Sequence, residues 1–444
     1  MKNVAVISLG CDKNRVDTEH MLYALSRGGY SVCDVDTADV IIVNTCAFIE
    51  GARQESIDVI LSCAEFKKTG VCKKLIVTGC LPQRYRDELE RSLPEVDGFL
   101  GAFEYDRLID IIDDDSRGEE YAESAAVDGA CDKFRDFERG GRLLTTYPHL
   151  AYVKIAEGCD NKCTFCAIPS IRGSYRSRPK SDIVSEVESL AKDGVREVIL
   201  VAQDVTRYGK DIGCDIVELL AALEKTAVDK LRLLYCYPEC VTDALIDKIA
   251  SSNKIAKYID IPAQHYSDRI LKLMNRRLSG GQLEELINKL HARGIVVRTT
   301  LMVGFPTETQ EDFDALRGFV ERAKPEYAGI FAYSKEDGTA AARLSGHIDK
   351  RTKKRRVDDL GKSATEATRK FNESIIGRTL DVLYEDADFD KNLFVGRADF
   401  QSPDVDGRVY FKARSVDVGK TYRVKITSCD DYDLYGEVCD ELTE

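Results

Sequence analysis

The feature that most constrains the fold is an alternation of apolar, strand-like runs with helical stretches, which occurs in two parts of the chain. Three runs lie in the first part, at residues 3–9, 38–44 and 74–78, and a polar or helical stretch follows each. Continuous apolar strands between helices are typical of a parallel sheet covered on both faces. The second part contains six such runs, at residues 151–156, 197–202, 231–235, 258–261, 295–303 and 327–332.

This pattern predicts an α/β protein in four parts. Residues 1–115 should form a parallel α/β N-terminal domain, and the charged, aperiodic residues 116–145 a linker. The six strand–helix units of residues 146–376 fall short of a complete eight-stranded barrel, which typically needs about 250 residues, so we expect a partial (βα)6 barrel. In residues 377–444, short alternating strands separated by turn residues predict a small antiparallel β-barrel.

Three cysteines follow the first strand of the predicted partial barrel. Cys159, Cys163 and Cys166 are spaced C-x3-C-x2-C, and no other Cys or His lies between His149 and Cys214. A structural zinc site usually has four protein ligands. A [4Fe-4S] cluster held by three cysteines instead leaves one iron open to a small molecule. The spacing therefore favours such a cluster, and an incomplete zinc knuckle or three unrelated thiols is the alternative.

A second set of three cysteines follows the three predicted strands of the N-terminal domain. Cys11, Cys46 and Cys80 each lie at the carboxyl end of a strand, where ligands of open α/β sheets collect. Gly10 and Gly79 precede two of them and permit close approach of the backbone. The functional interpretation is a second three-cysteine iron–sulfur site with an open iron. The alternative is a chance convergence of ordinary thiols.

The cysteine content indicates the cellular compartment of the protein, and its charge indicates which partners it can bind. The chain has 15 cysteines among 444 residues, without a secretory signal, so metal or redox use explains them better than disulfides, and we expect a cytoplasmic protein. No apolar run is long enough for a membrane span, so no membrane association is expected. The net charge of −13 does not favour binding to phosphate backbones, and nucleic acid contact should be at most secondary.

The cysteine loop at residues 158–173, with Phe165 before its last cysteine, resembles the signature of the radical S-adenosylmethionine (SAM) enzymes. In that family the open iron chelates SAM, and a radical made from SAM abstracts hydrogen from an unactivated C–H bond. We expect SAM to be bound by Phe165 and by Gln203, Gln264 and Arg298 of the barrel strands, although either glutamine could simply satisfy loop backbone groups. The basic stretch 172–179 is either a solvated turn or a site for a SAM or substrate carboxylate.

Three segments of the N-terminal domain resemble the methylthiotransferases, at residues 8–19, 44–46 and 78–83. In that family three cysteines bind an auxiliary [4Fe-4S] cluster, and all three are present here as Cys11, Cys46 and Cys80. The resemblance implies two [4Fe-4S] clusters, SAM and a reducing electron donor, with no catalytic residue beyond the clusters. The C-terminal part resembles a TRAM domain, an OB-like barrel usually associated with RNA.

Three further segments, at residues 258–265, 331–338 and 402–410, resemble the branch of this family that modifies ribosomal protein S12. This branch implies methylthiolation of the β-carbon of an aspartate in S12. From residue 377 onward there are nine Lys and Arg against sixteen Asp and Glu, which suits a basic protein partner such as S12. The alternatives are a tRNA adenosine (2-methylthio) methylthiotransferase and a non-catalytic iron–sulfur or zinc protein that binds the ribosome.

Overall fold

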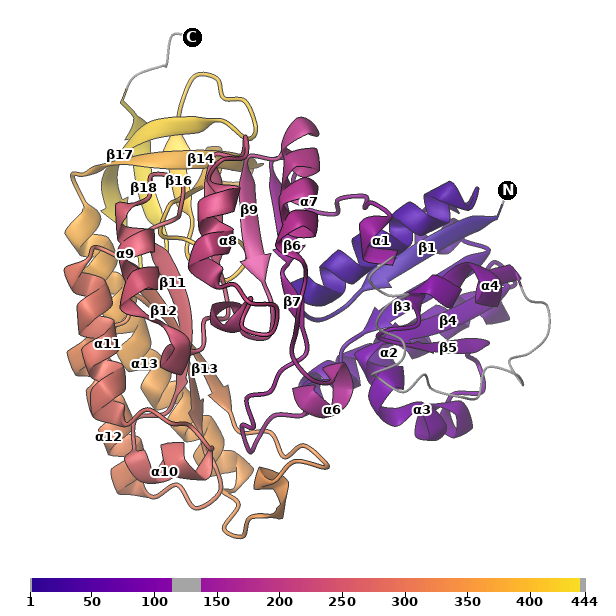
Figure 1. Cartoon of the computed structure of the whole chain (residues 1–444), viewed down its shortest axis with the longest axis horizontal. Helices are drawn as coiled ribbons and strands as arrows, with labels where there is room; N and C mark the ends of the chain where they lie inside the picture. Colours follow the sequence, from indigo (N-terminus) through magenta and orange to yellow (C-terminus); the bar gives the residue numbers. More distant parts are fainter. Residues whose placement is uncertain (1, 114–136, 440–444) are drawn as a thin grey trace. The chain divides into compact units, whose positions relative to one another are not determined.

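The computed structural model of the chain describes residues 2–113 and 137–439 (Figure 1). The contacts within it define two compact units. The first unit comprises Met1–Thr145, Ala156–Arg178 and Ser334–Ala342, and the second comprises Thr146–Ile155, Pro179–Tyr333 and Arg343–Glu444. The loop with three cysteines therefore belongs to the same unit as the N-terminal sheet. The linker predicted at residues 116–145 lies largely outside the described residues, and the domain boundaries after residues 115, 145 and 376 remain predictions.

The first unit is built on a five-stranded parallel sheet with the order β2-β1-β3-β4-β5. The three predicted strands are its three central strands. The two edge strands were not predicted: β2 has two residues, and β5 is a Gly-Phe-Leu-Gly segment that carries no strand pattern. The strands are β1 (Asn3–Ser8), β2 (Ser31–Val32), β3 (Val40–Thr45), β4 (Lys74–Gly79) and β5 (Gly98–Gly101).

Helices cover both faces of this sheet. Successive side chains of a strand point to opposite faces, so a strand with a continuous apolar run presents apolar side chains to the helices on each side. Ile41 packs in one core with Ile60 of α2, whereas Ile42 packs in a second core with Met21 of α1. This explains the continuous apolar pattern of β3, in which every residue is buried. The helices are α1 (Asp12–Arg27), α2 (Glu50–Lys68), α3 (Cys80–Ser92) and α4 (Leu108–Asp113), with short 3-10 helices η1 (Val35–Thr37) and η2 (Tyr105–Arg107).

The cysteine loop is closed at its base by a short hairpin and packs on the N-terminal sheet. Strand β7 (Ala156–Glu157) pairs antiparallel with β8 (Arg176–Ser177), and α6 (Ile168–Arg172) lies between them. Ile171 of α6 belongs to the same apolar core as Leu81 of α3. This packing places the loop in the first unit.

The segment Ser334–Ala342 also packs within the first unit. Glu336 is buried and accepts a hydrogen bond from Arg84 Nη1 at 2.9 Å, and it forms a second ion pair with Arg53. The amide of Ala341 donates to the carbonyl of Thr164 at 2.8 Å, which ties this segment to the cysteine loop.

The second unit contains the six predicted strands of the partial barrel, each running parallel to its neighbours. They form the orders β10-β9-β6 and β11-β12-β13, joined through a parallel bridge between Leu231 and Ile255. The predicted partial (βα)6 architecture is confirmed. The strands are β6 (Leu150–Lys154), β9 (Glu197–Val201), β10 (Lys230–Leu233), β11 (Tyr258–Gln264), β12 (Val296–Val303) and β13 (Tyr327–Ala332).

Helices follow the strands of the second unit along the chain, as the alternating sequence pattern predicts. Two of them begin at capping boxes, in which Ser279 and Thr309 exchange hydrogen bonds with the third helical residue. None of the helices in the described part of the chain is long and apolar enough to cross a bilayer. The helices are α7 (Lys180–Lys192), η3 (Val205–Arg207), α8 (Ile216–Leu223), η4 (Pro238–Cys240), α9 (Asp243–Ser251), α10 (Asp268–Leu273), α11 (Gly280–Ala292), α12 (Gln310–Ala323) and α13 (Lys350–Ile375). The short η5 (Ala341–Arg343) begins in the segment Ser334–Ala342 of the first unit.

The last five strands form a closed barrel with the order β14-β15-β16-β18-β17, drawn in yellow in Figure 1. Four of its five pairings are antiparallel, and β16 pairs with β18 in parallel. Val382, Phe411, Val424 and Leu434 fill the interior. The strands are β14 (Thr379–Asp388), β15 (Leu393–Ala398), β16 (Val409–Lys412), β17 (Thr421–Cys429) and β18 (Leu434–Val438).

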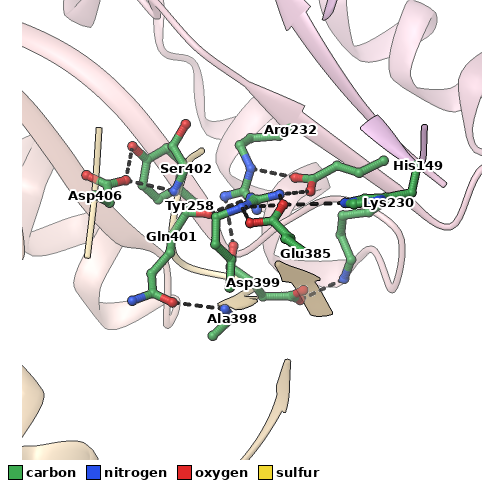
Figure 2. Close-up of polar contacts among 12 residues, drawn as sticks. His149, Lys230, Arg232, Tyr258, Glu385, Ala398, Asp399, Gln401, Ser402 and Asp406 are labelled. Atoms are coloured by element: carbon green, nitrogen blue, oxygen red, sulfur yellow. Dashed lines mark hydrogen bonds and ion pairs between the residues drawn. The ribbon is translucent and has the colours of Figure 1, made fainter. Parts of the chain in front are cut away.

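A buried charge network joins this barrel to the parallel strands of the second unit (Figure 2). Glu197 of β9 lies 2.8 Å from Arg232 of β10 and 2.8 Å from Arg397 of β15. Arg397 also contacts Glu385 of β14 at 2.6 Å. Glu197, Arg232 and Arg397 are almost fully buried, so their pairing connects β9 and β10 of the partial barrel to β15 of the C-terminal barrel.

Candidate functional site

The three strand-end cysteines lie at one edge of the N-terminal sheet. Cys11 directly precedes α1, Cys46 follows β3, and Cys80 follows β4 as the first residue of α3. Burial, together with the nearby thiols of Cys11 and Cys80, raises the pKa of Cys46 to about 12. The structure thus brings the three thiols together, because the carboxyl ends of parallel strands meet at one edge. Their role as metal ligands stays a prediction.

Two glycines allow these cysteines to approach one another. Gly10 and Gly79 have φ values of +90° and +97°, which favour glycine. A Cβ on Gly10 would lie 2.6 Å from Cys46 Cβ and 3.0 Å from Cys46 Sγ. A Cβ on Gly79 would lie 2.4 Å from Asn44 Oδ1. Each position therefore requires glycine for two reasons: its φ is positive, and a Cβ would clash with a residue of the cysteine site.

Substituting Gly10 by alanine should destabilise the protein by about 1–3 kcal/mol and lower its iron content after reconstitution. The added methyl group combines an unfavourable φ with a clash against Cys46. Urea unfolding and iron analysis measure the two effects. Gly29→Ala is the matched control, because Gly29 has φ +84° and an added Cβ would meet no atom within 4 Å. Equal iron loss in both variants would contradict the role given to Gly10.

Two asparagines connect the loops that carry the strand-end cysteines. Asn14 Nδ2 donates to the carbonyls of Leu9 and Thr45 at 3.0 and 2.9 Å, and Asn44 Nδ2 donates to the carbonyl of Asn14 at 3.0 Å. Both side chains are fully buried. The sequence analysis did not single them out, although both lie in segments that resemble the methylthiotransferases. Asn14 lies three residues after Cys11 and Asn44 two residues before Cys46, and this closeness in sequence was the signal that could have found them.

The loop cysteines form the second cluster of thiols in the first unit. Cys159, Cys163 and Cys166 lie between β7 and α6. Burial, together with the nearby thiols of Cys163 and Cys159, raises the pKa of Cys166 to about 12. The amide of Ile168 donates to Cys166 Sγ at 3.5 Å. A Cβ on Gly158, at φ +76°, would lie 2.1 Å from the carbonyl oxygen of Ser174, so the loop requires glycine there.

The donor chemistry of both cysteine sets fits an iron–sulfur cluster. Each set offers three thiols that lie near enough to affect the pKa of one of their number, and three cysteines leave one iron of a [4Fe-4S] cluster open. In residues 2–113 and 137–439, no three His, Cys, Asp or Glu side chains are arranged to hold a single metal ion. Thiolates that each bind a different iron need not converge on one point. Three cysteine thiols are the donors that such a polynuclear group takes from each set.

Arg172, at the end of α6, is buried beside the strand-end cysteine set. Its Nη1 lies 3.1 Å from Asp17 Oδ2 and 3.2 Å from Glu157 Oε2, while its Nη2 donates to Asn14 Oδ1 at 2.7 Å and Cys80 Sγ at 3.4 Å. The solvated turn considered for the stretch 172–179 is thus wrong for Arg172, which is 2% exposed. The carboxylates that it binds in the structure are those of Asp17 and Glu157.

The predicted SAM contacts are distributed over both units. Phe165 is half-buried in the cysteine loop, Gln203 follows β9, and Gln264 is the last residue of β11. Gln264 is buried with φ +70°, a conformation that is strained for a residue with a side chain and is concentrated at functional sites. Both glutamines lie at carboxyl ends of strands, where we expected them. Their contacts with SAM stay predictions.

Arg298 lies apart from the strand ends. It is the third residue of β12, five residues before the end of the strand, or roughly 16 Å at 3.3 Å per residue. Its Nη1 forms an ion pair with Asp406 Oδ1 at 2.9 Å, and Asp406 Oδ2 accepts from the hydroxyl of Tyr258 at 2.8 Å. A SAM contact by Arg298 would require this ion pair to open, and its assignment remains a prediction.

Family models match the chain in three places. The models are "Uncharacterized protein family UPF0004" at residues 3–101, the radical SAM superfamily at residues 153–320 and the TRAM domain at residues 376–439. They correspond to the N-terminal sheet with its strand-end cysteines, the cysteine loop with most of the partial barrel, and the closed C-terminal barrel. The predicted TRAM domain is thereby confirmed.

Curated relatives match the chain over its whole length. The chain is 45% identical over 449 residues to "ribosomal protein uS12 methylthiotransferase RimO" of Clostridium botulinum, with 99% of each chain covered. Proteins of the same name from Geobacter sulfurreducens and Pelobacter propionicus are each 45% identical, with 98% of each chain covered.

Solved structures share the fold at low sequence identity. The radical SAM methyltransferase TsrM from Kitasatospora setae, with cobalamin and a [4Fe-4S] cluster bound, matches with a TM-score of 0.56 at 15% identity, covering 86% of this chain and 80% of that one. Its structure with tryptophan and a SAM analogue has a TM-score of 0.54 at 15% identity, covering 74% and 73%. At this identity the match establishes the architecture alone.

Proposed function

The chain belongs to the family of ribosomal protein uS12 methylthiotransferases, and on that basis we propose that it methylthiolates the β-carbon of an aspartate in ribosomal protein S12. Identity of 45% over 98–99% of relatives from three organisms supports this assignment. The enzyme class is that of a radical SAM methylthiotransferase, with two [4Fe-4S] clusters and SAM as cofactors.

The observation that carries the proposal is the presence of two separate three-thiol sets in one compact unit. Cys159, Cys163 and Cys166 would hold the cluster that binds SAM, and Cys11, Cys46 and Cys80 would hold the auxiliary cluster. When bound, the first cluster supplies an electron that cleaves SAM reductively. Each set provides three thiolates and leaves one iron for a small molecule, which suits SAM at one site and sulfur at the other.

The remaining residues of the site position these groups and shield them from water. Asn14 and Asn44 fix the loops around the strand-end cysteines through buried hydrogen bonds. The cysteine loop packs through Ile171 into the N-terminal core, which excludes solvent from its inner face. Gln203 and Gln264 at the strand ends are our proposed SAM contacts, because their amides can bind its amino and carboxylate groups.

The partner of the reaction is proposed to be S12 itself, either free or within the small subunit. The acidic C-terminal barrel supports a basic protein partner, with nucleic acid contact at most secondary. A ribosomal substrate supports a cytoplasmic location for the enzyme. The chemistry also needs a reducing electron donor, because SAM cleavage consumes one electron.

Deletion of the gene should remove the methylthio group from the S12 aspartate, and mass spectrometry of S12 peptides measures this directly. Complementation with the intact chain should restore the modified peptide, whereas the Cys46→Ala variant should not. An unchanged methylthio-aspartate signal in the deletion strain would contradict the proposal. Loss of a methylthio-adenosine from tRNA digests, with S12 unaffected, would instead support the tRNA-modifying alternative.

A further inference from the structure

We propose that Arg172 is a positioning residue of the auxiliary site, which holds Cys80 and couples it to the cysteine loop. The inference rests on the proposed function in one respect, namely that the strand-end cysteines bind a cluster. It concerns how this chain arranges that site, and it goes beyond the assignment of the six cysteines. Arg172 lies six residues after Cys166, the last cysteine of the loop.

The contacts of Arg172 all lie within the first unit and bring together three separate segments of the chain. Asn14 and Asp17 come from α1, Cys80 from the start of α3, and Glu157 from β7. The guanidinium thus links the thiol of Cys80 to the segment of backbone that carries the loop cysteines. Any displacement of the loop would move this group away from Cys80.

The geometry of these contacts requires arginine. Nη1 faces the two carboxylates, while Nη2 faces the amide oxygen of Asn14 and the sulfur of Cys80. A planar guanidinium presents several donors in a fixed fork, whereas a lysine ammonium is a single point charge on a flexible chain. Lysine could keep the positive charge but could not make the same four contacts.

The charge of Arg172 has a direct consequence for a cluster bound by Cys80. Charge and hydrogen bonds to the sulfurs are among the factors that set the reduction potential of an iron–sulfur cluster. A buried cation beside the sulfur stabilises the reduced, more negative form of the cluster, because screening by water is weak there. Loss of Arg172 should therefore shift the potential of the auxiliary cluster to a more negative value.

The test uses the full chain with Cys159, Cys163 and Cys166 replaced by alanine, so that the strand-end set alone can bind a cluster. In this background, Arg172→Met should give a more negative reduction potential in an EPR-monitored titration and an altered EPR line shape. Arg172→Lys should stay closer to the parent potential, since it keeps the charge, but should share the altered line shape.

Arg176→Met is the matched control. Its guanidinium lies 5.5 Å from the centre of the Phe103 ring, which also lies 6.0 Å from the guanidinium of Arg172. No hydrogen bond joins Arg176 to a cysteine in the described part of the chain. This variant should keep the parent potential and line shape. An identical shift in both variants, or none in either Arg172 variant, would overturn the inference.

The experiment separates failure of this inference from failure of the proposed function. Without the strand-end cluster, the otherwise unaltered chain would bind about four irons instead of about eight, and the loop-alanine background would bind none. That result would sink the auxiliary site itself. If Arg172→Met does not fold, as circular dichroism of the apo protein would reveal, Arg172→Lys carries the test, and an unaltered line shape in it would contradict the positioning role.

Discussion

Replacing Cys163 with alanine is expected to abolish cleavage of SAM to 5′-deoxyadenosine, whereas replacing Cys46 should leave this cleavage largely intact and abolish methylthio transfer. The two cysteines belong to different thiol sets, so each substitution removes a ligand from one cluster only. Changes to groups that merely support a metal ligand already cost about 10–100-fold, and loss of a ligand itself should cost more. Cys163 would thus control radical formation and Cys46 sulfur delivery.

Anaerobically reconstituted protein with SAM, a reductant and S12 provides both readouts. Chromatography measures 5′-deoxyadenosine, and mass spectrometry measures modified S12. Cys33→Ala is the control, because this half-buried thiol follows the edge strand β2 and lies in neither cysteine set. It should keep both activities. Loss of SAM cleavage in Cys46→Ala, with normal folding and normal iron at the loop set, would show that the two sets are not independent.

The sequence predicted those features of the fold that depend on local pattern. Strands β3 and β4 contain the continuous apolar runs Val40–Val43 and Leu75–Val77, because both faces of the N-terminal sheet are covered, and these runs identify them in the sequence. The meeting of Cys11, Cys46 and Cys80 at one edge also follows, since parallel strands end together. Strand β5 could not be predicted from the sequence, because the composition of Gly98–Gly101 does not favour a strand. This segment becomes a strand by pairing with β4.

Contacts between distant segments could not be predicted in the same way. Arg172 lies in a stretch that resembles a charged turn, and its burial depends on Asp17 and Glu157, which lie 155 and 15 residues away. Arg298 sits in a strand of the barrel, but its partner Asp406 is 108 residues away in the C-terminal part. A sequence pattern indicates which residues are charged, but the pairing of buried charges is decided by the tertiary structure.

Glu197→Gln should destabilise the second unit by about 3–5 kcal/mol at pH 7, because it leaves two buried guanidinium groups without their shared carboxylate. Burial alone would raise the pKa of Glu197, but Arg397 and Arg232 outweigh it and lower the pKa from 4.5 to about 2. A depressed pKa stabilises the folded state above the unfolded pKa. This contribution, roughly 3 kcal/mol, is lost as the pH falls from about 4.5 to about 2.

The difference in stability between the parent chain and Glu197→Gln should therefore be largest at neutral pH and should narrow below about pH 4.5. Urea unfolding followed by circular dichroism at pH 7 and at pH 3, within the window in which the contribution is lost, measures this. Glu218→Gln is the control, since Glu218 is exposed and its ion pair with Lys180 should contribute no more than about 1 kcal/mol. A stability difference for Glu197→Gln that stays constant with pH would show that the carboxylate acts through its shape and hydrogen bonds. A difference that narrows would show that its charge, held between Arg232 and Arg397, joins the C-terminal barrel to β9.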